Sequence, residues 1–333
     1  MLPIALDAMG GDHAPQEIVQ GAVAAVQEAG LNVLLVGRQE EMEACLSSPL
    51  PPRLTLVHAP DVIGFDESPT QAVQQKPLSS ISVGLRLVAE GNASAFVSAG
   101  ATGAVLSGAF LQLGTLEGIE RPALSVYYSI PGGGPCLLLD VGANADCRPS
   151  FLLQFARLGC RYMERVQGIQ RPTVGLLSNG TEEGKGSRLV KESYALLQQS
   201  ELNFVGNAEG TDLYTGHVQV MVTDGFTGNV LLKATEGLAE TLLGQLAQVV
   251  KNGLKYPEAK SFMATTLEAF KQRMDYSEYG GAVLLGVRGN VVVAHGRSRA
   301  RAVGNALRLA QQMVVQGMPQ TLIGGDHGQA DSG

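Results

Sequence analysis

The sequence predicts an α/β protein in which a mostly parallel sheet is covered by helices on both faces, as a three-layer, doubly wound fold. Short and almost continuously apolar runs recur along the chain, and such runs are typical of strands buried on both faces. They read PIALDA, NVLLVG, RLTLVHA, SAFVSAG, CLLLDVG, TVGLLSNG, VQVMVTDG and NVVVAHG. Helical stretches alternate with these runs, as parallel strands joined by crossovers require. The 42 glycines, the absence of tryptophan and the 5% aromatic content favour this turn-rich class over a sandwich or a bundle.

Helices are expected between the strands, together with a separate helical region. The expected helices cover 15–30, 79–91, 102–114, 149–167 and 297–317. Residues 231–276 contain two amphipathic segments separated by Gly253 and Pro257, which predicts a helical hairpin that projects from the sheet or packs across a dimer interface. Ordinary burial of its apolar face is the alternative. We expect a single catalytic domain over 1–333, with this excursion inside it and a disordered polar tail at 324–333.

Composition excludes several classes of protein. The net charge of −7 argues against a broad nucleic-acid surface. The four cysteines, Cys45, Cys136, Cys147 and Cys160, have no metal-ligand spacing and are expected to be reduced, structural thiols of a cytoplasmic chain. The N-terminus enters a strand at once and carries Asp7, unlike a signal peptide. Apolar runs fall short of the ~18 residues that a spanning helix needs, which leaves peripheral membrane contact open.

Polar, glycine-rich turns follow six of the predicted strands. The turns contain, in chain order, Asp7, Gly10, Gly11, Asp12 and His13; Ser98, Gly100, Thr102 and Gly103; Asp140 and Asn144; Ser178, Gly180 and Lys185; Asp224, Gly225, Gly228 and Asn229; and His295 and Arg297. Parallel strands end at one edge of a sheet, where α/β proteins hold ligands, so we expect these turns to converge on one phosphate and substrate site. For any one turn, a polar rim without function is the alternative. The turns lack the GxxxxGK[ST] pattern, and no GxGxxG follows the first strand, which disfavours an NTPase or a standard NAD domain.

Eight motifs carry a resemblance to a known family. They are LDAMGGD, FDESPTQAV followed by KPLSS, SAGATGA, DVGANADCRP, NGTEEGKGS, EGTDLYTG, VTDGFTGNV and HGRS. In this order, from residue 4 to about residue 300, they resemble the bacterial phosphate acyltransferases of the PlsX family. Ala101 and Ser178 depart from the family pattern, which usually has asparagine at both positions.

The resemblance implies an activity, partners and a fold. The activity is transfer of a fatty acyl group from the acyl carrier protein (ACP) to inorganic phosphate. Its products are free ACP and an acyl phosphate that a glycerol-3-phosphate acyltransferase uses in phospholipid synthesis. Family members are cytoplasmic homodimers that touch the membrane peripherally. Their fold is similar to those of isocitrate and isopropylmalate dehydrogenases and of phosphotransacetylase.

Direct attack of phosphate on a thioester needs orientation and oxyanion stabilisation rather than a covalent intermediate or a cofactor. We expect the 98–103 loop to bind phosphate at a helix N-terminus, with Lys185 as the countercharge. Asn229 is the expected donor to the oxyanion or phosphate, with a helix cap as its alternative. Asp224 is expected to orient Asn229 or Lys185, or to cap the turn. His13 is expected to protonate the leaving sulfur or to shape its loop.

No metal requirement is predicted. Asp7, Asp12 and Asp140 are the carboxylates that could suggest a metal site. Hard cations need clustered oxygen ligands, however, and the sequence does not show that these three cluster.

The helical excursion mixes cationic and apolar side chains. They are Lys251, Lys255, Lys260, Lys271 and Arg273, with Leu254, Phe262, Met263 and Phe270. This pattern predicts contact with acidic ACP, with an anionic bilayer, or with both. A solvated helix face is the alternative.

Three other functions compete with this one. They are a phosphotransacetylase-like transferase that uses acyl-CoA, an NAD-dependent β-decarboxylating dehydrogenase, and a non-enzymatic membrane scaffold for lipid synthesis.

Overall fold

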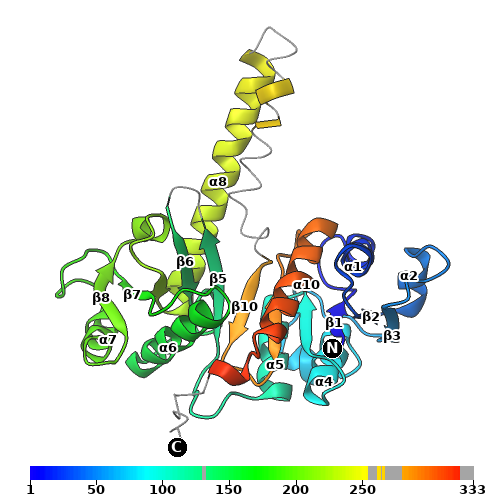
Figure 1. Ribbon diagram of the computed structural model, residues 1–333, viewed down its shortest axis with the longest axis horizontal. Coiled ribbons are helices and arrows are strands. Elements are labelled where there is room, and N and C mark those ends of the chain that lie inside the picture. Colours follow the sequence, from blue (N-terminus) through cyan, green and yellow to red (C-terminus); the bar gives the residue numbers. More distant parts are fainter. Residues whose placement is uncertain (130–132, 254–260, 264, 267–279, 323–333) are drawn as a thin grey trace, which may run out of the picture.

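One continuous sheet runs through the molecule. The computed structural model describes residues 1–129, 133–253, 261–263, 265–266 and 280–322 (Figure 1). The strands are β1 (Ile4–Asp7), β2 (Val33–Gly37), β3 (Leu54–His58), β4 (Ala95–Ser98), β5 (Ala123–Ser129), β6 (Pro135–Leu139), β7 (Thr173–Leu177), β8 (Asn203–Ala208), β9 (Val220–Val222), β10 (Ala282–Leu285) and β11 (Asn290–Val293). Within the described residues these eleven strands pair in the order β3-β2-β1-β4-β11-β10-β5-β6-β9-β7-β8.

The sheet consists of two parallel halves that point in opposite directions. We call β3, β2, β1, β4 and β11 the first half, and β6, β9, β7 and β8 the second half; strands within each half are parallel. Between the halves, β10 is antiparallel to both β11 and β5, and β5 is antiparallel to β6. Three reversals in succession turn the second half round. The strands of the two halves therefore end at opposite edges of the sheet.

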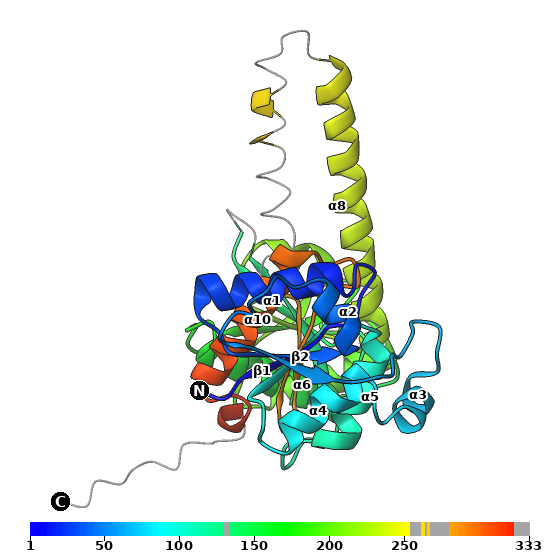
Figure 2. The ribbon, with the colours of Figure 1, turned by 90° about the vertical axis from the view of Figure 1, so that its right-hand side faces the viewer.

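Helices cover both faces of the sheet and give the predicted three-layer fold. They are α1 (Gln16–Ala29), α2 (Gln39–Ala44), α3 (Pro69–Gln75), α4 (Ser80–Ala89), α5 (Thr102–Leu113), α6 (Pro149–Arg165), α7 (Arg188–Gln198), α8 (Gly225–Gly253) and α10 (Ala300–Val315), with short 3₁₀ turns η1 (Gly210–Tyr214) and η3 (Gln320–Leu322). Side chains alternate between the faces of a strand. Ile4 and Leu6 of β1 therefore belong to the core cluster on the face that α1 and α10 cover, whereas Ala5 belongs to the cluster on the face that α4 covers (Figure 2).

Each helix predicted outside the excursion is present, with bounds that differ by up to three residues. The eight apolar runs also form strands, namely β1, β2, β3, β4, β6, β7, β9 and β11. The strands that the sequence analysis missed are β5, β8 and β10. Two of these, β5 and β10, reverse the direction of the sheet.

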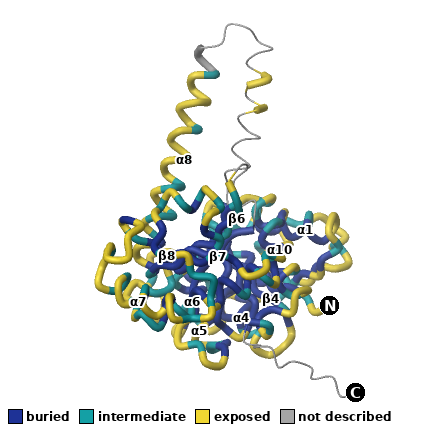
Figure 3. Tube along the Cα trace, turned by 60° about the vertical axis from the view of Figure 1, so that its left-hand side comes forward, coloured by how far each residue is buried: buried dark blue, intermediate teal, exposed yellow. Residues whose placement is uncertain are grey.

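Helix α8 connects the two edges and then leaves the body of the protein. It begins after β9 in the second half, and Glu240 on its fifth turn pairs with Arg297 of the first half at 2.8 Å. Beyond this ion pair the helix projects from the body (Figure 1) and is largely exposed (Figure 3). The apolar positions Leu238, Leu242 and Leu246 are each about half exposed or more. The described part of the excursion thus presents its apolar stripe outward instead of burying it in the core.

Several expected contact residues of the excursion lie outside the described residues. They are Leu254, Lys255, Lys260, Phe270, Lys271 and Arg273, and the tail 324–333 lies outside them as well. Phe262 and Met263 are described and are exposed, whereas the side chain of Lys251 is not described. Within the described ranges, no helix has the length and apolar character needed to cross a membrane.

Candidate active site

The six polar turns form two groups rather than one. The first-edge group comprises the turns after β1, β4 and β11 and contains Asp7, Gly10, Gly11, Asp12, His13, Ser98, Gly100, Thr102, Gly103, His295 and Arg297. The second-edge group comprises the turns after β6, β7 and β9 and contains Asp140, Asn144, Ser178, Gly180, Lys185, Asp224, Gly225, Gly228 and Asn229. The expectation of one common edge is wrong, because β10 and β5 reverse the sheet between the two groups. The 98–103 loop and Lys185, expected to share one phosphate, stand at opposite edges.

In the first-edge group, a buried carboxylate joins two neighbouring turns. The Ser98 hydroxyl donates to Asp7 Oδ2 at 2.7 Å, and the Met9 amide donates to Asp7 Oδ1 at 3.0 Å. The Gly100 amide donates in turn to Ser98 Oγ at 3.0 Å. A Cβ at Gly10 would lie 2.5 Å from both Asp7 Oδ2 and the Gly100 nitrogen, so this approach needs glycine. Burial raises the pKa of Asp7 above its ordinary value, and the carboxylate holds the turns instead of facing solvent.

The rest of this group lies nearer the surface. The Asp12 amide donates to the Gly296 carbonyl at 2.8 Å, which joins the turn after β1 to the turn after β11. Gly11 has a φ of 105°, a conformation that L side chains rarely adopt. His13 is half-buried, and Thr102, the first residue of α5, is exposed.

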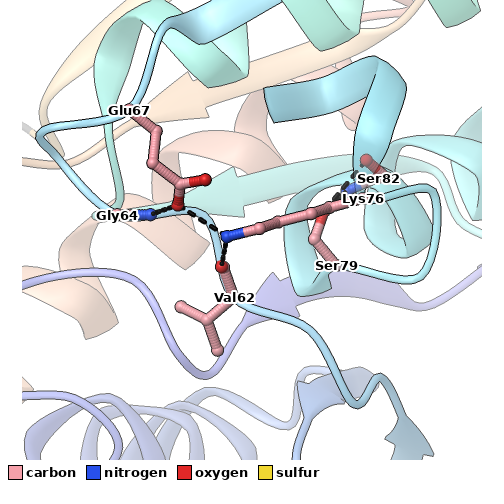
Figure 4. Close-up of polar contacts among 6 residues, drawn as sticks. All are labelled: Val62, Gly64, Glu67, Lys76, Ser79 and Ser82. Atoms are coloured by element: carbon pink, nitrogen blue, oxygen red, sulfur yellow. Dashed lines mark hydrogen bonds and ion pairs between the residues drawn. The ribbon is translucent and has the colours of Figure 1, made fainter. Parts of the chain in front are cut away.

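A segment from the FDESPTQAV motif lies beside these turns, since a Cβ added at Gly103 would meet Pro69 and one at Gly296 would meet Phe65. Polar contacts fix the segment (Figure 4). The Lys76 ammonium donates to Glu67 Oε1 at 2.7 Å and to the Val62 carbonyl at 2.9 Å, while Glu67 Oε1 also accepts the Gly64 amide at 2.6 Å. The hydrogen bond from Lys76 lowers the pKa of Glu67 below its ordinary value. The loop that these contacts close carries Phe65, whose side chain is 59% exposed.

In the second-edge group, Asp140 organises the turn after β6. Its Oδ1 accepts the amides of Leu124 at 3.0 Å, Gly142 at 3.1 Å and Ala143 at 3.0 Å. Its Oδ2 accepts the amide of Asn144 at 2.7 Å and the Asn144 side-chain nitrogen at 2.9 Å. Burial raises the pKa of Asp140, against the lowering effect of these bonds. Asp140 and Asn144 therefore shape the turn, and their side chains are occupied in doing so.

Asp224 is the N-terminal cap of α8. Its Oδ1 accepts the Thr227 amide and its Oδ2 accepts the Thr227 hydroxyl, both at 2.8 Å. The Gly225 amide donates to the Asn144 carbonyl at 2.7 Å, which seats the helix on the turn after β6. A Cβ at Gly228 would overlap the Asp140 carbonyl oxygen. Of the two roles considered for Asp224, its contacts are those of the cap.

Asn229 and Lys185 each keep a polar group that has no hydrogen-bond or ion-pair partner among the described residues. Asn229 Nδ2 donates to the Val141 carbonyl at 2.9 Å, and among the described residues no partner takes its second N–H or its oxygen. Lys185 is exposed, and the aliphatic part of its side chain lies over Gly180. A Cβ added at Gly180 would lie 3.1 Å from Lys185 Cγ. No described carboxylate forms an ion pair with its ammonium. Ser178 Oγ is buried nearby without a hydrogen-bond partner in the described part of the chain.

The sequence analysis missed two arginines at this edge. Arg148 follows the turn of Asp140 and Arg121 precedes β5. Arg148 stands within the DVGANADCRP motif, which was the available signal, whereas nothing in the pattern singles out Arg121. Cys147, next to Arg148, donates its thiol to the Asn144 carbonyl at 3.5 Å. Burial, with Asp140 nearby, raises the pKa of Cys147 to about 12, so the thiol is protonated at neutral pH.

The three carboxylates considered for a metal do not meet. Asp7 and Asp12 belong to the first-edge group and Asp140 to the second. Among the described residues, His, Cys, Asp and Glu side chains form no group of three that could hold a metal ion.

Comparison with known proteins identifies the family of this chain. A family model described as a fatty acid synthesis protein matches residues 2–321. The chain belongs to this family. It is 50% identical over 319 residues to a phosphate acyltransferase of Desulforamulus reducens, covering 96% of this chain and 95% of that protein. It is 46% identical to a phosphate acyltransferase of Nostoc punctiforme, covering 93% and 92%. The family resemblance and the expectation of an acyltransferase enzyme are confirmed.

Solved structures confirm the fold. A phosphotransacetylase from Streptococcus pyogenes matches with a TM-score of 0.61 at 18% identity, covering 94% of each chain. A branched-chain phosphotransacylase from Enterococcus faecalis matches with a TM-score of 0.60 at 16% identity, covering 94% of this chain and 99% of that one. A 4-hydroxythreonine-4-phosphate dehydrogenase from Klebsiella pneumoniae has a TM-score of 0.55 at 13% identity, covering 94% and 99%. The likeness to phosphotransacetylases and to a dehydrogenase fold agrees with the prediction.

Proposed function

We propose that this protein transfers a fatty acyl group from acyl-ACP to inorganic phosphate, and that the reaction occurs at the second edge. The observation that carries the proposal is that Asn229 and Lys185 stand at the same edge with polar groups available. They follow the neighbouring strands β9 and β7 and keep an amide N–H and an ammonium group without described partners. A neutral donor and a cation on turns that follow neighbouring strands suit an oxyanion and a phosphate held at the same edge. The names of the family's curated relatives support the same reaction class.

The reaction balances without a covalent enzyme intermediate. An oxygen of hydrogen phosphate attacks the thioester carbonyl carbon, the C–S bond breaks, and the phosphate proton ends on the ACP thiol. Lys185 holds the phosphate and Asn229 donates to the developing oxyanion. Fixing the two reactants can supply about 7–11 kcal/mol, and an oxyanion donor typically contributes about 3–4 kcal/mol. The protonated thiol of Cys147 is a poor nucleophile, which favours direct attack over an acyl-cysteine.

The proposal extends to location and partners. We place the enzyme in the cytoplasm as a homodimer with peripheral membrane contact, supplying acyl phosphate to a glycerol-3-phosphate acyltransferase for phospholipid synthesis. The exposed stripe of Leu238, Leu242 and Leu246 supports an apolar partner for the excursion. The cations of the same region, which include Lys251, suit acidic ACP or anionic lipid.

The test supplies the purified protein with acyl-ACP and orthophosphate. Free ACP is quantified, and acyl phosphate is trapped as its hydroxamate. We expect both products to form together and only when orthophosphate is present. A parallel reaction with acyl-CoA distinguishes the two donors, and faster turnover with acyl-CoA would favour the phosphotransacetylase-like alternative. No acyl phosphate from either donor would refute the proposal.

A further inference from the structure

The turn after β6 borders a cavity to which the proposed reaction assigns no role. The cavity has a volume of about 430 Å³, and its lining includes Arg121, Ala143, Asn144, Cys147, Arg148 and Phe151. Arg121 precedes β5 and Lys185 follows β7, with β6 and β9 between these two strands. The cavity therefore lies on the side of the turn away from Lys185.

Two guanidinium groups give the cavity its charge. Arg121 lies over the ring of Phe110, with 5.8 Å from its guanidinium carbon to the ring centroid, and Arg148 lies over Phe151 at 5.1 Å. These contacts orient the guanidinium groups through their faces and leave the N–H edges available. Among the described residues neither group has a carboxylate ion-pair partner. Of the described residues that line the cavity, Asp146 is the single carboxylate, so the positive charge is in excess.

The cavity and the proposed reaction centre share one turn. Asn144 lines the cavity, and its carbonyl accepts the Gly225 amide at 2.7 Å, at the first residue of α8. Asn229, one turn further along α8, donates to the Val141 carbonyl at 2.9 Å. A chain that starts in the cavity can thus follow the turn after β6 to reach Asn229.

We propose that this cavity binds the phosphate group of the phosphopantetheine arm that carries the acyl thioester; the proposal rests on the proposed function. Arginine forks pair bidentately with phosphate, and Arg121 and Arg148 supply two of them. The size falls within the ~300–1,000 Å³ of sites for organic ligands and exceeds what orthophosphate fills. Phe151 and Ala143 add an apolar wall that suits the organic chain beyond the phosphate.

The test compares donors that differ only in the arm's phosphate. Arg121→Gln, Arg148→Gln and the double variant are assayed with acyl-phosphopantetheine, with acyl-pantetheine and with acyl-ACP, each at varied orthophosphate. We expect the KM for the two phosphate-bearing donors to rise about tenfold or more in the double variant, as for loss of hydrogen bonds to a charged group. The KM values for acyl-pantetheine and for orthophosphate should not change. Arg157→Gln is the matched control, because Arg157 lies on α6 in an exposed ion pair with Glu201 at 2.9 Å.

The remaining outcomes overturn the inference. A raised KM for orthophosphate would assign the cavity to the acceptor, and an equal loss with both free thioesters would assign the arginines to folding. Unchanged donor KM values would show that the cavity does not recognise the arm. Calorimetric titration with 4′-phosphopantetheine gives a readout independent of turnover: we expect wild-type binding that the single variants weaken. An inactive wild type that still binds the arm in this way would refute the proposed function and support this inference.

Discussion

The hydroxyl of Ser98 and the buried carboxylate of Asp7 form a hydrogen bond of 2.7 Å that links the ends of β4 and β1. Asp140 has the corresponding place in the second half, where its carboxylate accepts bonds from the turn that follows β6. Each parallel half thus uses a buried aspartate at the end of one of its strands to fix its turns. Burial raises the pKa of both groups.

The raised pKa of Asp7 makes a prediction about stability and pH. Because the folded state binds the proton more tightly than the unfolded state, this group favours folding most below its ordinary pKa of 3.8. The contribution is lost as pH rises from there through the folded pKa. We expect wild type to lose stability relative to Asp7→Asn as pH rises across that window, measured as urea midpoints of both proteins at several pH values. A constant difference between the two proteins would contradict a raised pKa.

Asp224 allows its two proposed roles to be separated. Asp224→Ala removes the cap of α8 and should lower the free energy of unfolding by about 1 kcal/mol, with a range of roughly 0.5–2 kcal/mol. Asp224→Asn retains an acceptor for the Thr227 amide and should keep most of both stability and turnover. Thermal unfolding and acyl phosphate formation are measured on the same preparations. A stable Asp224→Asn variant with a hundredfold lower kcat would assign the carboxylate to the reaction.

The strands that the sequence left undetected explain why the six turns do not share the one edge that was expected. Local hydrophobic pattern identifies a buried strand but carries no information on its direction, which long-range pairing decides. In β5 the run ALSVYYS is interrupted by serines, and the buried Ser125 satisfies its hydroxyl by donating to the Val283 carbonyl of β10 at 3.0 Å. When β5 and β10 are left out of the predicted strands, every strand of the sheet is expected to be parallel. The individual turns could therefore be predicted, but not their division between two edges.

The arginines of the cavity illustrate the same limit. Arg121 precedes β5 and Arg148 follows β6, so the antiparallel pairing of these strands is what brings the two together. No spacing in the sequence encodes that approach. Asp224, by contrast, stands three residues before Thr227 at the start of a helix, and such a local cap can be predicted from the sequence.

Cys147 provides a test of direct attack. Its thiol, with a pKa raised to about 12, is protonated throughout the neutral range. We expect Cys147→Ser to keep kcat within about twofold of wild type, and we expect the pH profile from 6 to 9 to be the same for both. Mass spectrometry of the wild-type enzyme quenched during turnover should show no acylated cysteine. An acyl adduct on Cys147 that forms and decays at the rate of turnover would establish a covalent route instead.

The apolar stripe of α8 is expected to mediate association. Leu242→Gln with Leu246→Gln keeps good helix formers while removing apolar area, at about 1.5–3 kcal/mol for each fully buried leucine. We expect the thermal stability of the monomer fold to change little and either dimer formation or vesicle binding to weaken at least tenfold. Sedimentation velocity and flotation with anionic vesicles measure the two separately. Ala247→Gln, on the opposite side of the helix, is the control. Equal dimer formation and equal vesicle binding by wild type, the double leucine variant and the control would contradict a role of the stripe in association.

Substitutions of Lys185 and of Asn229 are expected to change different kinetic constants. Lys185→Ala removes a cation that holds phosphate, so the KM for orthophosphate should rise by about tenfold or more, as for a lost charge-assisted hydrogen bond. Asn229→Ala removes a donor whose bond strengthens as the oxyanion forms, so kcat should fall by about 10²–10³ with little change in KM. Lys191→Ala, an exposed lysine on α7, is the matched control and should behave as wild type. Because Lys185 is exposed and Asn229 makes one hydrogen bond within the described structure, both variants should fold, which circular dichroism checks. Wild-type kinetics in both variants would exclude the second edge as the reaction centre and direct attention to the turns that Asp7 holds.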